Sequence, residues 1–317
     1  SLFSIFFILE NIEKSSFMEY KLITIFDKRS VFSKTECFHS LNRNNVSNKL
    51  FVKRDDLIHA EVSGNKWRKL KWNIIRAVEN NCNFISTYGG AYSNHLLATA
   101  SLGNELNLKT RAFVRGDELN YNSNHILKRC YDLNMQLIFL SRNEYKKVKY
   151  STGIDPLNNS IWNVPEGGAN REGVMGCKEI MDETDNNYDY VVIAQGTTTT
   201  SLGVLTSLNP KSKLIVVPVL KGFDSIYEMK KLASRCNLPL DLSRVLVLDQ
   251  YHFGGYAKTN VHLNQFVSDF NNANTFNIEQ TYTGKSLFAM NDFIKSQKLR
   301  DKRVLFIHTG GLANRLD

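Results

Sequence analysis

The stretch Phe84-Ile85-Ser86-Thr87-Tyr88-Gly89-Gly90-Ala91-Tyr92-Ser93-Asn94-His95 contains a complete change from strand to helix. Its first four residues are apolar or small and predict a buried strand, and the two glycines predict a turn. Ser93 and Asn94 are residue types that begin helices. Leucines at helical spacing follow, at 97, 102 and 106. The stretch therefore predicts a strand, a glycine loop and a helix in succession.

Other short apolar runs predict further strands, and helical-length segments separate many of them. These runs are Thr110–Val114, Gln136–Leu140, Tyr190–Ala194, Leu214–Val219, Val245–Leu248 and Val304–His308. Strands that alternate with helices indicate an α/β fold with a mostly parallel sheet. In such sheets a ligand lies beyond the carboxyl ends of the strands, where glycine-rich loops lead into helices.

The size of the chain and its cysteines limit the possible classes of protein. With 317 residues it can bury a large core in one α/β domain or in two domains. Its five cysteines are odd in number, scattered and never in a CxxC pair. This argues against a disulfide framework and a zinc site, and favours a reducing, cytoplasmic location. His95 has no second ligand at suitable spacing, so no metal is expected.

The formal charge of +9 permits attraction to phosphates, nucleic acid or membrane. The basic clusters at 66–71 and 146–149 lack the patterns of nucleic-acid-binding motifs, so no nucleic-acid partner is expected. The apolar run at 2–9 is too short to span a bilayer, and no membrane partner is expected. Residues 1–17 precede Met18 and are interpreted as an extension, with a truncated signal sequence as the alternative.

A candidate nucleophile is Lys66, in Ser63-Gly64-Asn65-Lys66-Trp67-Arg68-Lys69-Leu70. A lysine in a glycine-led turn at the start of a helix can form a Schiff base, because packing and nearby cations lower its pKa. The alternative is a solvated surface charge. Lys69 lies one helical turn further on the same face, where it can meet a phosphate of the same small molecule.

Two loops offer groups that suit anions. Gln195-Gly196-Thr197-Thr198-Thr199-Thr200 follows a predicted strand, and its amides and hydroxyls suit a phosphate dianion. It lacks the GxxxxGK[ST] pattern, and an ordinary turn is the alternative. Ser93 and Asn94 can likewise receive a substrate carboxylate, or Ser93 can be a simple helix cap.

Two tyrosines lie beside glycines late in the chain, Tyr256 after Gly254-Gly255 and Tyr282 before Thr283-Gly284. They can flank a planar ring or donate a proton, and simple packing is the alternative.

Six short motifs, taken together, resemble the pyridoxal-phosphate enzymes of the 1-aminocyclopropane-1-carboxylate (ACC) deaminase and D-cysteine desulfhydrase family. The similarity runs from Phe51 to Leu312. The motifs are Ser63-Gly64-Asn65-Lys66-x-Arg68-Lys69-Leu70, Gly89-Gly90-Ala91-x-Ser93-Asn94-His95, Pro165-Glu166-Gly167-Gly168, Gly196-Thr197-x-Thr199-Thr200, Tyr282-Thr283-Gly284-Lys285 and His308-Thr309-Gly310-Gly311.

The resemblance implies the tryptophan synthase β subunit fold, which is PLP fold type II. Two open, twisted, mostly parallel sheets flanked by helices are expected. Residues 1–72 and 166–317 would form a large cofactor-binding domain, and 73–165 a smaller inserted α/β domain. The cofactor, pyridoxal 5'-phosphate, would lie in the cleft between them, and a homodimer or larger homo-oligomer is expected.

The same resemblance assigns roles to individual residues. Lys66 would form the Schiff base and Asn65 would contact the pyridoxal 3'-oxygen. The phosphate and the rest of the cofactor would be held by Lys69, Gly196, Thr197, Thr198, Thr199, Thr200 and Thr309. Ser93, Asn94 and His95 would face the substrate, and Tyr256 and Tyr282 would line the ring and the active site. Lys66, Ser93 and Tyr282 would be catalytic.

The choice between the two activities depends on a few positions. Deaminases of this family usually have glutamate after the late tyrosine, whereas this chain has Thr283. Together with Thr309 and His95, this favours D-cysteine desulfhydration, which gives pyruvate, sulfide and ammonia. The alternatives are ACC deamination, which gives 2-oxobutanoate and ammonia, and a non-catalytic binding protein.

Three residues depart from the family's pattern. Tyr92 replaces a common glutamine, Leu97 a common arginine, and Thr198 a common glycine of the phosphate loop. Tyr92 can re-aim the substrate pocket. A Cβ at position 198 would be strained if the loop required a positive φ there.

Overall fold

The computed structural model describes residues 22, 25–26, 33–39, 47–62 and 64–311. The apolar run at 2–9, the segment 1–17 and Ser63 lie outside the described residues. The chain forms two compact units. Unit 1 comprises Lys66–Gly173 with the described part of Ser1–Val31, and unit 2 comprises Phe32–Asn65 and Val174–Asp317. The domain boundaries expected at 72 and 165 stay a prediction.

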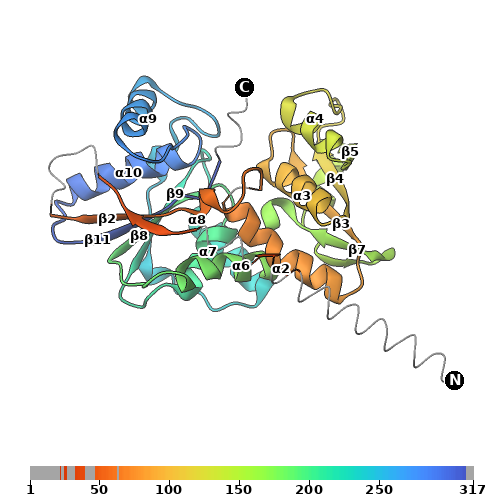
Figure 1. The fold of residues 1–317 in the computed structure, drawn as a ribbon, viewed down its shortest axis with the longest axis horizontal. Helices are drawn as coiled ribbons and strands as arrows, with labels where there is room; N and C mark the ends of the chain where they lie inside the picture. Colours follow the sequence, from red (N-terminus) through yellow and green to blue (C-terminus); the bar gives the residue numbers. More distant parts are fainter. Residues whose placement is uncertain (1–21, 23–24, 27–32, 40–46, 63, 312–317) are drawn as a thin grey trace. The chain divides into compact units, whose positions relative to one another are not determined.

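Unit 2 is built on a sheet that has six strands in the described part of the chain, ordered β1-β2-β11-β8-β9-β10 (Figure 1). The strands are β1 (Thr35–Cys37), β2 (Lys49–Lys53), β8 (Tyr190–Gln195), β9 (Lys213–Pro218), β10 (Val245–Val247) and β11 (Arg303–Ile307). Edge strand β1 pairs antiparallel with β2, and the other pairs are parallel.

Helices cover both faces of this sheet because its strands are apolar on both sides. Val192, Ile215 and Phe306 pack toward α9 (Val261–Ala273) and α10 (Thr283–Ser296). Their neighbours in the strands pack in a separate cluster with α6 (Arg171–Asp182), α7 (Thr199–Ser207) and α8 (Ser225–Cys236). In Figure 1, α10 and α7 accordingly lie on opposite sides of β8 and β11.

Unit 1 contains a second sheet, in which five described strands have the order β5-β4-β3-β7-β6. They are β3 (Phe84–Gly90), β4 (Lys109–Arg115), β5 (Gln136–Leu140), β6 (Gly153–Asp155) and β7 (Asn158–Val164). Only β6, among these described strands, pairs antiparallel.

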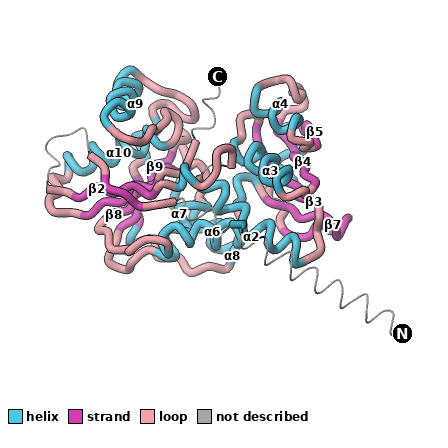
Figure 2. The backbone as a smooth tube through the Cα atoms, in the orientation of Figure 1, coloured by secondary structure: helices cyan, strands magenta, loops and turns pink. Residues whose placement is uncertain are grey.

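The described helices of unit 1 include α2 (Asn65–Glu79), which begins at the last residue of unit 2, α3 (Asn94–Glu105), α4 (His125–Asp132) and α5 (Arg142–Val148). Leu96 and Ala100 of α3 share a cluster with Leu127 of α4 and with Ala112 and Val114 of β4. Figure 2 shows α3 and α4 beside these strands.

The α/β prediction with two mostly parallel sheets is confirmed. Each apolar run predicted to be a strand is a strand, and the loops at 88 and 195 do begin helices. The sequence did not predict β1, β2, β6 or β7 as strands. The β7 segment begins Asn158-Asn159-Ser160, whose polarity conceals the buried residues that follow it.

Candidate active site

Three neighbouring parallel strands of unit 2, β2, β11 and β8, end at the same edge of the sheet. Asn65 therefore lies near two distant loops. Its Nδ2 donates to Thr200 Oγ1 at 2.9 Å, and its backbone N–H donates to the Thr309 carbonyl at 3.2 Å. Gly64 has φ +63°, and a Cβ there would lie 2.0 Å from the Thr309 oxygen. Only glycine permits this approach, which brings Asn65, Thr200 and Thr309 together.

The threonine loop passes directly into α7. Thr198 is the N-cap with φ −83° and ψ −4°, so its Cβ meets no backbone strain, and the concern about positive φ does not apply. Thr199 is fully buried, and its Oγ1 has no hydrogen-bond partner. A buried hydroxyl without a partner is costly, and a bound anion would satisfy it. The loop therefore fits a phosphate at a helix N-terminus.

The two predicted tyrosines also meet in unit 2. The rings of Tyr256 and Tyr282 lie 5.9 Å apart between centroids, edge to face. Burial and the hydrogen bond to Tyr256 raise the pKa of Tyr282 well above its usual value, so this phenol keeps its proton. Gly196 packs against the Tyr282 ring, where a Cβ would lie 3.0 Å from Cε1. This contact connects the tyrosine pair to the threonine loop.

A residue that the sequence analysis did not single out fixes the backbone around Tyr282. The buried carboxylate of Glu279 accepts hydrogen bonds from the backbone N–H groups of Thr281, Tyr282 and Thr283, at 2.5, 2.8 and 2.8 Å. The Thr283 hydroxyl lies 3.1 Å from the same carboxylate. A carboxylate at a helix N-terminus satisfies N–H groups that have no partner within the helix. The available signal was an acidic residue three positions before Tyr282.

Lys66 and Lys69 lie on the first turns of α2 in unit 1. Lys66 is partly buried, and only 2 % of Lys69 is exposed. The turn Glu166–Gly168 packs on Lys69, because a Cβ at Gly168, where φ is +68°, would lie 3.0 Å from the Lys69 Cβ. Neither lysine is a freely solvated surface charge.

Two asparagine side chains connect α2 to the segment that follows the Glu166–Gly168 turn. Asn170 Nδ2 donates to Asn73 Oδ1 at 2.7 Å, and Asn73 Nδ2 reaches Asn170 Oδ1 at 3.2 Å. Trp162 Nε1 also donates to Asn73 Oδ1, at 3.2 Å, and Asn73 Nδ2 donates to the Lys69 carbonyl at 2.7 Å. The sequence analysis missed both asparagines.

His95 is buried and neutral. Burial, together with the charges of Lys66 and Lys69, lowers its pKa to about 3. Thr87 Oγ1 donates its one proton to the Val164 carbonyl at 2.9 Å, so it accepts from His95 Nε2 at 3.0 Å. The proton is therefore on Nε2, and the buried Nδ1 is an acceptor with no hydrogen-bond partner.

Ser93 is the N-cap of α3, but its side chain makes no capping hydrogen bond, so its hydroxyl is not used by the helix. The buried Oδ1 of neighbouring Asn94 also lacks a hydrogen-bond partner. Of the departures from the family's pattern, Leu97 is a core residue and Tyr92 is 58 % exposed.

The predicted site residues thus form two groups. Unit 1 holds Lys66, Lys69, Ser93, Asn94 and His95. Unit 2 holds Asn65, Gly196, Thr197, Thr198, Thr199, Thr200, Tyr256, Tyr282 and Thr309. The peptide bond between Asn65 and Lys66 joins the two groups. The cleft position of the cofactor stays a prediction.

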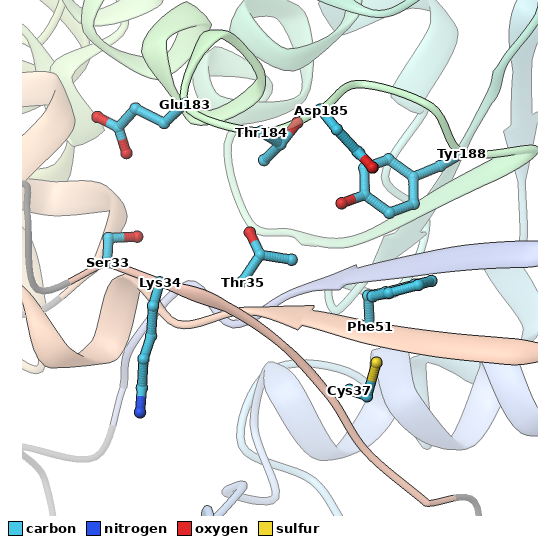
Figure 3. Close-up of a pocket in the computed structure, with 9 residues that line it drawn as sticks. All are labelled: Ser33, Lys34, Thr35, Cys37, Phe51, Glu183, Thr184, Asp185 and Tyr188. Atoms are coloured by element: carbon cyan, nitrogen blue, oxygen red, sulfur yellow. The ribbon is translucent and has the colours of Figure 1, made fainter.

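A pocket of about 350 Å³ elsewhere in unit 2 contains none of these residues (Figure 3). It lies between the segment 183–188 and a second wall formed by residues 33–37 and Phe51. Its carboxylates are paired, Glu183 with Lys53 at 2.8 Å and Asp185 with Arg303 at 2.7 Å. These ion pairs leave it no distinct ligand chemistry. None of the helices in the described part of the chain combines the length and the apolar character that a membrane span requires.

The threonine loop thus combines a buried, unpartnered hydroxyl with a hydrogen bond to Asn65, the residue that precedes a helical lysine. The chain belongs to the family described as "Pyridoxal-phosphate dependent enzyme", whose model matches residues 30–310. Its cofactor is therefore pyridoxal phosphate, and it is an enzyme.

Two relatives are similar to most of the chain. The chain is 28% identical over 302 residues to the mitochondrial bifunctional D-cysteine desulfhydrase/ACC deaminase of Arabidopsis thaliana, covering 84% of this chain and 73% of that protein. It is 27% identical over 288 residues to the D-cysteine desulfhydrase of Yersinia pestis, covering 84% and 87%. The resemblance found in the sequence is confirmed.

A solved structure described as an ACC deaminase homologue has the same fold. Its TM-score is 0.74 at 20% identity, and the match covers 89% of this chain and 90% of that one.

Proposed function

We propose that this enzyme removes hydrosulfide from D-cysteine and so produces pyruvate, hydrogen sulfide and ammonia. The observation that carries this choice is Thr283, which presents a neutral hydroxyl directly after Tyr282. The nearby Glu279 carboxylate is already bound to the N–H groups of its own turn. A carboxylate at the pyridine nitrogen would strengthen the electron sink, which cyclopropane opening needs more than thiolate expulsion does.

The cofactor-binding residues follow from the two groups described above. Thr199, Thr200 and the N–H groups at the start of α7 would hold the phosphate, with Gly196, Thr197, Thr198 and Lys69 beside it. Asn65 would contact the 3'-oxygen, Thr309 would lie near the ring, and Lys66 would carry the cofactor. When bound, pyridoxal phosphate supplies the electron sink for negative charge at the substrate α-carbon.

The chain's own residues would then move protons and orient the substrate. The Lys66 amine removes the α-proton, and Ser93 and Asn94 orient the carboxylate. Tyr282, which keeps its proton, donates a hydrogen bond to the leaving sulfur. Breaking the Cβ–S bond releases hydrosulfide, which takes up the proton removed from the α-carbon to become hydrogen sulfide, and leaves 2-aminoacrylate. Water converts the latter into pyruvate and ammonia, which balances the reaction.

His95 has a different role from Tyr282. Because its imidazole stays neutral and donates through Nε2 to Thr87, we assign it to hydrogen bonding through Nδ1 rather than to proton donation. An amine or thiol of the substrate is a suitable donor for that nitrogen.

Two assays test the proposal. Protein purified with pyridoxal phosphate is expected to absorb near the visible edge and to produce equal amounts of pyruvate and sulfide from D-cysteine. Lys66→Ala is expected to lose both properties. An unmodified protein with normal absorbance that produces no sulfide from D-cysteine would reject this substrate, and L-cysteine serves as the stereochemical control.

A second candidate function is ACC deamination to 2-oxobutanoate and ammonia. The paired phenols of Tyr256 and Tyr282 favour it, because opening a cyclopropane requires a proton donor at carbon. Measuring 2-oxobutanoate from ACC beside pyruvate from D-cysteine decides between the two. A protein that binds pyridoxal phosphate but converts neither substrate would instead be a binding protein.

We propose further that the enzyme is a cytoplasmic homodimer with a large cofactor-binding domain and a smaller inserted one. The scattered cysteines support the location, since four of the five are buried and none, in the described chain, is in a disulfide. The threonine loop of unit 2, which we propose holds the phosphate, supports the assignment of the cofactor to the larger domain. Light scattering of the purified protein and cell fractionation test the assembly and the location.

A further inference from the structure

Lys285, the third residue of α10, has no exposed surface. None of the roles assigned above uses it. Its Nζ donates to the His252 carbonyl at 2.9 Å and to the Gly255 carbonyl at 2.7 Å. Burial lowers its pKa to about 8, and the charge of Glu279 acts in the opposite direction. Lys285 is therefore mostly charged at neutral pH, and both hydrogen bonds are charge-assisted.

The two carbonyls belong to a loop with an unusual backbone. Phe253, Gly254, Gly255 and Ala257 all have positive φ, at 52°, 96°, 121° and 55°. Such conformations are unfavourable for Phe253 and Ala257, so surrounding contacts must hold the loop in place. The loop's own hydrogen bonds join Gly255 N–H to the His252 carbonyl at 3.0 Å and Lys258 N–H to the Gly255 carbonyl at 3.1 Å.

Tyr256 directly follows the clamped Gly255 carbonyl. Its side chain is 40 % exposed, so surrounding packing fixes it only in part. Its ring nevertheless meets Tyr282, which lies three residues before Lys285 at the start of α10. The start of α10 is thus connected to Tyr256 in two ways. The Tyr282 ring meets the Tyr256 ring, and Lys285 binds the Gly255 carbonyl that directly precedes Tyr256.

We propose that Lys285 is a positioning residue, whose ammonium group closes the 252–258 loop and so places the Tyr256 phenol against Tyr282. The inference rests on the proposed function, because it assumes that Tyr256 lines the active site. Lys285 acts through Tyr256 and contacts no reacting atom.

Hydrogen exchange measured by mass spectrometry tests the structural half of this proposal. Lys285→Met keeps the length of the side chain and removes its donors. We expect the amides of residues 249–258 to exchange at least about tenfold faster, while α9 exchanges as in the unmodified protein. The matched control is Lys258→Met, which removes an exposed lysine from the same loop. Equal exchange in the two variants would overturn the proposal.

A double-mutant cycle tests the functional half. On the substrate that the unmodified enzyme uses, we expect Lys285→Met and Tyr256→Phe each to lower kcat by about 10- to 100-fold, with a smaller effect on KM. In the Tyr256→Phe background the same substitution should cost less than about twofold. Lys285→Gln, which keeps one donor, should fall between Lys285→Met and the unmodified enzyme.

Additive losses in the cycle would show that Lys285 acts independently of Tyr256 and would overturn the proposal. If the unmodified enzyme converts neither D-cysteine nor ACC, the proposed function fails. The exchange experiment still decides whether Lys285 holds the loop.

Discussion

The most unusual single residue is His95, whose charge state follows from three neighbours and its burial. Thr87 fixes the proton on Nε2, while burial and two lysine charges prevent a second proton from binding. A neutral imidazole beside two lysines keeps the site able to accept hydrogen bonds at Nδ1.

We expect the His95 ring to remain neutral, with its proton on Nε2, from pH 5 to 9. Nitrogen NMR of the imidazole measures this, and His95→Gln assigns the signals. In Thr87→Val the acceptor is lost, and the tautomer should no longer be fixed. A His95 titration near pH 6 would contradict the burial argument.

His95 also gives the folded chain an acid sensitivity. Its pKa is about 3 in the folded state and 6.5 ordinarily, so between these values the unfolded chain binds a proton that the folded chain does not. The stability linked to His95 is therefore complete above pH 6.5 and is lost as the pH falls toward 3. Urea midpoints at pH 7 and pH 5 should differ less in His95→Gln than in the unmodified protein.

The Thr199 hydroxyl provides a second prediction at this scale. Thr199→Val removes a buried oxygen that has no partner, so the cofactor-free protein should keep or gain stability. Affinity for pyridoxal phosphate should fall about tenfold, because a hydrogen bond to the phosphate is lost. Absorbance titration and thermal melting measure the two effects. The matched control is Thr206→Val, because the Thr206 hydroxyl already donates to the Gly203 carbonyl.

At the scale of elements, one buried carboxylate holds the N-terminus of α10. Glu279 satisfies three N–H groups there, and Gly284 N–H donates to the Glu279 carbonyl at 2.7 Å. The Tyr282 backbone lies inside this turn, so the stability of the helix end and the position of a candidate catalytic group have the same cause.

We expect Glu279→Gln to reduce the free energy of unfolding by about 1–3 kcal/mol, since the amide can accept only part of these hydrogen bonds. Urea denaturation measures the loss. Glu228→Gln, at the first turn of α8, should change stability by less than about 0.5 kcal/mol. A loss of equal size in both variants would mean that Glu279 acts only as a general first-turn charge.

At the scale of the whole molecule, both sheets place their loops by the same rule, that parallel neighbours end at a common edge. In unit 2 this gathers the loops after β2, β8 and β11. In unit 1 the loops after β3 and β7 follow two paired strands in the same way.

A cofactor that binds the folded protein but not the unfolded chain should stabilise the whole protein by mass action. At a hundredfold excess of pyridoxal phosphate over its Kd, the expected gain is about 2.7 kcal/mol, visible as a higher Tm. Pyridoxal, which lacks the phosphate, should give a smaller shift at the same concentration because the threonine loop stays unfilled. Equal shifts from the two compounds would contradict a phosphate role for that loop.

The sequence by itself determined seven of the described strands, the two glycine loops that begin helices, and the order of motifs that indicates pyridoxal phosphate. These features are local, because the spacing of apolar residues and the chemistry of turns operate over a few neighbouring residues. Only the tertiary structure decided the Asn65–Thr200 contact, across 135 residues, and the Asn73–Asn170 pair, across 97. It also decided which nitrogen of His95 carries the proton, and the hydrogen bonds from Lys285 to the loop that contains Tyr256. No local pattern specifies which distant backbone or side chain a buried polar group will meet, because the packing of whole elements determines it.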